Sequence, residues 1–170
     1  MLSVVRTTSH LVEMNMVGFD IKFDVPSHGW LPVVLGISRE TYEFAASYVL
    51  SDPVSELALA CLHLLRRPTG ATVRFWLEPR YSILDLECAS TSTTVATFKH
   101  STTEDGKRPE SVISATVDTS EFCRLVARRL RTMYELTGAD RYSTHDCAGK
   151  AFPDETISSI YDLLRSRRNG

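Results

Sequence analysis

The chain has 170 residues, of which 43% are hydrophobic and 24% charged, a composition typical of a soluble globular protein. Its 19 basic and 21 acidic side chains give a formal net charge of −2, which argues against a dedicated nucleic-acid binder and against an acidic mimic of nucleic acid. No apolar stretch approaches the length of a transmembrane helix or a signal-peptide core, so we expect a single cytoplasmic domain without a membrane partner.

Regular structure is predicted to begin at Val17. Residues 1–13 show no periodicity and are expected to form an irregular extension, and Met14 and Met16 leave a later translation start open. From Val17 to Val25, apolar and polar residues alternate strictly. This alternation is the pattern of a strand with one buried face.

Two further strands are predicted at Leu31–Ile37 and Tyr42–Tyr48. A turn at His28 aligns the first two strands, and a turn centred between Arg39 and Glu40 aligns the second and third. Both alignments place the apolar residues on one common face, whereas a slip of one residue would bring charge into that face. The second turn would create four pairs: Ile37 with Tyr42, Leu35 with Phe44, Val33 with Ala46, and Leu31 with Tyr48. The result is a three-stranded antiparallel meander.

The segment from Asp52 to Arg67 is predicted to be the central helix. Asp52 is a good N-cap, Pro53 suits the first helical position, and Pro68-Thr69-Gly70 ends the helix. The helix is apolar on almost every side, so we expect it to lie buried between a sheet and other helices. One polar line remains, formed by Glu56, His63 and Arg67.

A second hairpin is predicted from Ala71–Glu78 and Tyr81–Cys88, with its turn centred on Pro79-Arg80. This register puts Val73, Phe75 and Leu84 on the inner face. The outer face would then carry three pairs: Arg74 with Asp85, Trp76 with Ile83, and Glu78 with Tyr81.

The remaining elements complete an α+β fold. Strands are predicted at Val95–His100 and Val112–Val117, around a polar tip that contains Asp105-Gly106, a strong turn signal. A helix capped by Thr119 or Ser120 should reach Thr137, and a third helix should begin at Pro153-Asp154-Glu155. The predicted fold is an antiparallel meander of about six to seven strands. It has a central helix after strand three and two C-terminal helices packed on it.

No residue pattern reaches the specificity of a catalytic or metal motif. His145-Asp146-Cys147 could supply a ligand or a nucleophile, but the further ligands that a metal hydrolase needs are missing. Asp85 and Glu87 share a strand face, where they would act as an acid–base pair or form a salt-paired surface with their neighbours Arg74 and Thr72. No cofactor is expected. The four cysteines lack a C-x-x-C spacing and are expected to be free, mostly buried thiols: Cys61, Cys88, Cys123 and Cys147.

Two features suit a binding surface better than a catalytic one. Arg74, Trp76 and Tyr81 gather on the outer face of the second hairpin, and these residue types dominate interface hot spots. The alternative is that the third helix or the N-terminal extension covers Trp76. A line of arginines on the second helix is either a partner or phosphate contact or a solvated face: Arg124, Arg128 and Arg131. The candidate partner-binding residues are Arg74, Trp76, Tyr81, Asp85 and Glu87.

Three segments carry a resemblance to known proteins: FAASYVLSDPVSEL (Phe44–Leu57), FWLEP (Phe75–Pro79) and FPDETISSIYDLL (Phe152–Leu164). Together they resemble uncharacterised small bacterial α+β proteins, similar in build to the single-domain immunity proteins of polymorphic-toxin systems. The shared motifs are helix caps and entries, so they transfer no catalytic residue. The resemblance implies a bacterial cytosolic protein that binds another protein, with a cognate toxin as the specific case.

The resulting hypothesis is a non-enzymatic binding protein of the immunity type. One alternative is an enzyme or small-ligand binder with a pocket beneath the central helix, near His63, Asp85 or His145. A second alternative is a structural subunit of a bacterial assembly. The sequence leaves the oligomeric state open.

Overall fold

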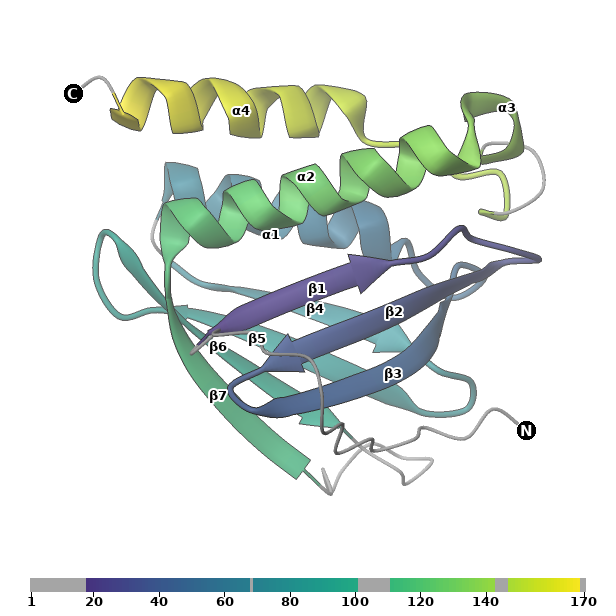
Figure 1. Ribbon diagram of the computed structural model, residues 1–170, viewed down its shortest axis with the longest axis horizontal. Helices are drawn as coiled ribbons and strands as arrows, with labels where there is room; N and C mark the ends of the chain where they lie inside the picture. The colour runs from purple at the N-terminus through teal and green to yellow at the C-terminus, as the bar shows by residue number, and fades with distance from the viewer. Residues whose placement is uncertain (1–17, 68, 101–110, 143–146, 169–170) are drawn as a thin grey trace.

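The structure is a computed structural model that describes residues 18–67, 69–100, 111–142 and 147–168 (Figure 1). Within these residues, three strands, one helix, four further strands and three helices follow one another along the chain. The strands are β1 (Phe19–Phe23), β2 (Trp30–Ile37), β3 (Glu40–Ser47), β4 (Ala71–Trp76), β5 (Tyr81–Cys88), β6 (Thr93–His100) and β7 (Ser111–Asp118). The helices are α1 (Pro53–Arg66), α2 (Thr119–Thr137), α3 (Ala139–Arg141) and α4 (Asp154–Arg168).

The strands form two antiparallel sheets, one in the order β1-β2-β3 and one in the order β4-β5-β6-β7. The predicted α+β fold, with its meander strands, its helix after β3 and its two C-terminal helices, is confirmed. Aromatic rings fill the space where the two sheets face each other. Phe44 lies 5.2 Å from Phe75 and 5.8 Å from Phe98, measured between ring centroids. These contacts join strands that the sequence separates widely into one core.

The predicted turn positions are correct for the first hairpin and wrong for the second. β1 and β2 pair about His28 as predicted, with Ile21 opposite Leu35. In the second hairpin, Leu35 lies opposite Tyr42 instead of Phe44, because the chain turns at Ser38-Arg39, one residue earlier than predicted. The pairing therefore moves by two residues, which leaves the apolar face unchanged.

The β4–β5 register also differs from the predicted one by two residues. Arg74 lies opposite Ile83, so the predicted pairing of Arg74 with Asp85 is wrong. The physical reason is the turn. The backbone N–H of Leu77 donates to the carbonyl of Arg80 at 2.7 Å, which places the turn one residue before its predicted centre. Trp76 and Tyr81 consequently lie directly across from each other.

Helix α1 lies at the centre of the helical layer, as predicted. Asp52 caps it by accepting hydrogen bonds from the backbone N–H of Ser55 at 3.0 Å and from its hydroxyl at 2.8 Å. The helix packs against α2, α4 and β4. Its inward residues are buried, Leu57 and Cys61 among them. The sequence predicts eight core residues, of which Phe23 is partly buried and the other seven are buried: Phe23, Leu35, Phe44, Leu57, Cys61, Leu65, Phe75 and Leu84.

Helices α2 and α4 cover α1, and Figure 1 shows α4 running across the top of the helical layer. The N-cap of α2 is Asp118, one residue before the predicted cap, and its carboxylate accepts from the backbone N–H of Glu121 at 2.9 Å. Near the C-terminal end of α4, the Arg167 guanidinium donates to the Leu65 carbonyl of α1 at 2.6 Å. This hydrogen bond brings the C-terminal ends of α1 and α4 together. No helix in the described parts of the chain is long and apolar enough to cross a membrane.

The segment after α2 supplies a core residue that its sequence did not predict. Tyr142 is fully buried, and its hydroxyl lies 3.3 Å from that of Tyr48. Burial raises the pKa of both phenols. The predicted N-terminal extension and the Asp105-Gly106 turn lie outside the described residues.

Candidate functional site

The candidate site lies on the face of the four-stranded sheet that points away from the core. Successive side chains of a strand alternate between its two faces, and Val73, Phe75 and Leu84 are buried on the inner one. We call the opposite side the outer face. On β4 and β5 it consists of Thr72, Arg74, Trp76, Tyr81, Ile83, Asp85 and Glu87.

At the turn end of the hairpin, three of these side chains form an aromatic–arginine cluster: Arg74, Trp76 and Tyr81. The Arg74 guanidinium carbon lies 5.6 Å from the Trp76 ring centroid and 5.1 Å from that of Tyr81. The two rings lie 5.3 Å apart. Arg74 is exposed, and both rings are half-buried. These distances fall in the range of cation–π attraction, which holds the guanidinium in place at the surface.

The third predicted helix does not cover Trp76 in the described part of the chain. That helix, α4, packs on α1 and α2. The other candidate cover, the N-terminal extension, lies outside the described residues.

Helix α1 supports the cluster from the edge of β4. The backbone N–H of Arg74 donates to a Glu56 carboxylate oxygen at 3.2 Å. Burial raises the pKa of Glu56, and the hydrogen bond and charge of Arg74 partly offset this rise. Arg74 is thus held by the helix through its backbone and by the two rings through its side chain.

Asp85 and Glu87 lie apart from the cluster, toward the other end of the hairpin. The Asp85 carboxylate accepts from the Thr72 hydroxyl at 2.8 Å and from Lys99 Nζ at 2.5 Å. The hydrogen bond and the charge of Asp85 raise the pKa of Lys99. Glu87 is exposed and, with Asp85, borders a hollow of about 380 Å³ beside Gly70. Asp85 therefore belongs to a salt-paired surface, and the five predicted site residues divide into two groups.

Sequence reasoning missed one polar pair with the residue types of a catalytic dyad. Ser82 and His100 lie opposite each other on β5 and β6, with the hydroxyl oxygen 2.8 Å from His100 Nδ1. Both side chains are buried, so the hydroxyl is closed to a substrate. The pairing depends on the register of two strands, and neither residue carries a local motif that could have revealed it.

The other candidates contribute no site among the described residues. His63 is exposed on α1, His145 and Asp146 lie outside the described residues, and Cys147 is buried. No three histidine, cysteine or acidic side chains in the described part of the chain are placed to hold a metal ion. Comparisons with known protein families, with curated proteins and with solved structures found no match, so the function has to be argued from the chain's own residues.

Proposed function

We propose that this chain is a non-enzymatic protein that binds another protein through its aromatic–arginine cluster. The observation that carries the proposal is the Arg74 guanidinium, which lies over the Trp76 and Tyr81 rings at the surface of the four-stranded sheet. Tryptophan, tyrosine and arginine supply most hot spots of protein interfaces. Their large, partly apolar surfaces exclude water from a contact, while the guanidinium supplies directed donors.

The arrangement also keeps the entropic cost of association small. Each aromatic side chain has only two rotatable torsions, and the two rings restrict the guanidinium before any partner arrives. A surface whose side chains are already ordered loses less conformational freedom on binding. The strands beneath it are rigid because their inner side, with Phe75 and Leu84, is part of the core.

The charges of the outer face favour a protein over a nucleic acid. Asp85 and Glu87 lie on the same face as the cluster and would repel a phosphate backbone. Lys99 is already paired with Asp85. A face with both signs of charge beside an aromatic centre matches the usual make-up of a protein interface.

For the partner, we propose a bacterial toxin that the chain neutralises in the cytoplasm as an immunity-type protein. The support for this class is the sequence resemblance carried by Phe44–Leu57, Phe75–Pro79 and Phe152–Leu164. The cluster supplies the surface through which a toxin would be held.

Affinity capture with quantitative mass spectrometry tests the binding surface. Tagged wild type, Trp76→Ala and Leu136→Ala would be purified from the cells that make the protein. Leu136 is an exposed apolar residue on α2, away from the outer face, so it is a matched control. We expect a stoichiometric partner with wild type and Leu136→Ala, and its loss with Trp76→Ala. Retention by all three proteins, or no partner at all, would contradict the proposal.

Co-expression tests the class of the partner. The captured protein would be expressed alone, with the wild-type chain, and with Trp76→Ala. A toxin arrests growth alone, and the wild-type chain restores growth while Trp76→Ala does not. A partner that leaves growth unchanged would exclude the toxin while preserving the binding surface.

A further inference from the structure

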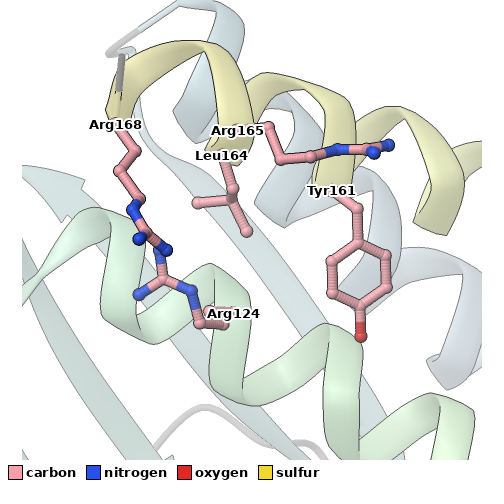
Figure 2. A pocket seen from close by; sticks show the side chains of 5 residues that line it. All are labelled: Arg124, Tyr161, Leu164, Arg165 and Arg168. Carbon is pink, nitrogen blue, oxygen red and sulfur yellow. The ribbon is translucent and has the colours of Figure 1, made fainter.

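A second candidate surface lies in the helical layer, away from the outer face. Helices α2 and α4 leave a groove of about 420 Å³ between them, lined by Arg124, Tyr161, Leu164, Arg165 and Arg168. Figure 2 shows the Tyr161 and Leu164 side chains directed from α4 toward α2, and the Arg168 and Arg124 side chains pointing toward each other. We call it the α2–α4 groove.

The floor of the groove is apolar. Leu164 is buried, and the ring of Tyr161 is half-buried beside it. The methylene stems of Arg124 and Arg168 extend this floor, because long cationic side chains cover apolar surface while their charged ends stay in water. The groove thus offers apolar contact in its centre and guanidinium groups at its rim.

The charges at the rim are poorly neutralised. Arg168 has no carboxylate partner among the described residues. Arg124 is paired with Glu121 and Arg165 with Asp162, but Arg124 is 42% exposed and the other three side chains are 70% exposed or more, so solvent weakens both ion pairs. Two guanidiniums that face each other across one groove repel, and an anion placed between them would relieve this repulsion.

More positive charge lies at the same end of the helical layer. The hydrogen bond from Arg167 to the Leu65 carbonyl brings the end of α4 to the end of α1. Arg66 and Arg67 are exposed at that end of α1. This concentration of arginine contrasts with the net charge of −2 of the whole chain. It produces a local positive potential that attracts acidic ligands.

We propose that the α2–α4 groove binds an acidic amphipathic peptide segment of a partner protein. One large apolar side chain of the segment would lie on Tyr161 and Leu164, and flanking carboxylates would pair with Arg124 and Arg168. Guanidinium matches carboxylate in a two-point geometry, which gives such a site direction as well as charge. The proposal is independent of the outer face, so either surface can fail without the other.

The same features disfavour the other anionic ligands. A nucleic acid would bring a continuous row of phosphates past Glu121 and Asp162, which would repel it. A membrane surface presents a plane of headgroups, whereas this site is a concave groove between two helices. A single peptide segment, with one apolar side chain on the floor and carboxylates at the rim, fits the mixed character of the groove.

Fluorescence anisotropy with the full chain tests the proposal. The probe is a fluorescein-labelled acidic nonapeptide, Glu-Glu-Leu-Glu-Glu-Trp-Leu-Glu-Glu. The neutral control is the same labelled peptide with Gln in place of every Glu. We expect the acidic peptide to bind about tenfold more tightly than the neutral one, and Arg124→Gln or Arg168→Gln to remove about tenfold of that affinity. Arg128→Gln removes the same charge from an exposed position of α2 outside the groove, and should change the affinity by less than about twofold.

Competition by other anions completes the test. Phosphatidylserine vesicles and a single-stranded DNA oligonucleotide should displace the acidic peptide only weakly. Equal affinity for the two peptides would overturn the proposal, as would an Arg128→Gln loss as large as that of Arg168→Gln. Tight binding of vesicles or DNA together with weak binding of the acidic peptide would also overturn it and would assign the groove to that other ligand.

Discussion

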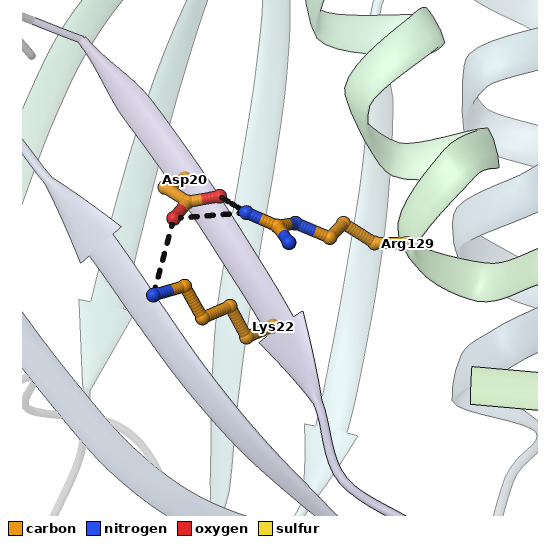
Figure 3. Close-up of polar contacts among 3 residues, drawn as sticks. All are labelled: Asp20, Lys22 and Arg129. Carbon is orange, nitrogen blue, oxygen red and sulfur yellow. Dashed lines mark hydrogen bonds and ion pairs between the residues drawn. The ribbon is translucent and has the colours of Figure 1, made fainter. Parts of the chain in front are cut away.

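Arg129 on α2 donates from one guanidinium nitrogen to both carboxylate oxygens of Asp20 on β1, at 3.1 and 3.4 Å (Figure 3). Asp20 is buried and Arg129 is about one-third exposed. The two residues are 109 positions apart in the sequence. Their ion pair fixes α2 to the edge strand of the three-stranded sheet, next to the packing of Phe19 on Phe122.

Removal of Asp20 should therefore destabilise the fold. Asp20→Ala leaves the partly buried Arg129 without its partner, and we expect a loss of about 1–3 kcal/mol in the free energy of unfolding, less than for a fully buried pair because Arg129 reaches solvent. Urea unfolding followed by circular dichroism measures it. Lys22 lies 3.9 Å from the same carboxylate with a half-exposed side chain, so Lys22→Ala should cost less than about 0.5 kcal/mol. Equal losses for the two variants would contradict this role of Arg129.

Truncation of Leu57 tests the central place of α1. Leu57 is fully buried where the helix meets its neighbours, and Leu57→Ala should cost about 2–5 kcal/mol through lost burial and the cavity it leaves. Leu59 is on the same helix but 45% exposed, so Leu59→Ala should cost much less. Chemical denaturation of both variants gives the comparison. Similar values for the two would mean that α1 is not the centre of the core.

Two glycines separate backbone strain from steric clash. Gly70 has φ +84° and Gly138 has φ +81°, both in the left-handed region that side chains disfavour. A Cβ at Gly70 would lie 2.7 Å from the Leu86 carbonyl oxygen, whereas a Cβ at Gly138 would meet nothing within 4 Å. Gly138→Ala should therefore cost about 1–2 kcal/mol from strain, and Gly70→Ala a further 1–3 kcal/mol or so from the clash. Thermal or urea unfolding of the pair tests the difference, and equal costs would contradict the close approach.

The raised pKa of Glu56 predicts that this residue makes the stability of the fold depend on pH. Burial raises its pKa, so the folded state binds the proton more tightly than the unfolded state. The resulting penalty appears as the pH rises from the ordinary glutamate range through the raised pKa, and it is complete above that value. Glu56→Gln does not titrate, so it should be at least as stable as wild type at neutral pH. This advantage should vanish at acidic pH.

Unfolding curves of both proteins over a pH series measure the Glu56 effect. A variant that is less stable than wild type, with a gap that grows as the pH rises, would show the reverse. In that case Arg74 and the N-terminal dipole of α1 would favour the charged carboxylate more than burial disfavours it.

Local patterns predicted the elements and their faces because those properties depend on neighbouring residues. Strict alternation located β1, and Asp52-Pro53 located the start of α1. The same patterns left the β2–β3 and β4–β5 registers open to a shift of two residues, since such a shift preserves the face of every side chain. Turn geometry decided them, and Ser38, with φ +56°, has no strong turn signal in the sequence.

The candidate site was predictable as a set of residue types on one face. Arg74, Trp76 and Tyr81 came together as expected because alternation fixes the face. The pairing of Arg74 with Asp85 was wrong because the neighbours of Asp85 depend on strand registers, which place Thr72 and Lys99 beside its carboxylate. Pairs such as Asp20 with Arg129 depend on how distant elements pack, which no local pattern records.

The four free thiols differ in burial, so their rates of chemical modification report on different parts of the fold. Cys61 and Cys123 are buried between α1 and α2, where the Cys123 sulfur donates to the Cys61 carbonyl oxygen at 3.6 Å. A side-chain hydrogen bond with Cys123, together with burial, raises the pKa of the Cys61 thiol, which disfavours its reactive thiolate form. Cys147 is also buried, so Cys88, half-buried at the end of β5, is the most accessible thiol of the native state. Under native conditions, an alkylating reagent would modify Cys88 first, and each later mass increment would report the opening of the buried contacts around the other three thiols, including the contact between α1 and α2.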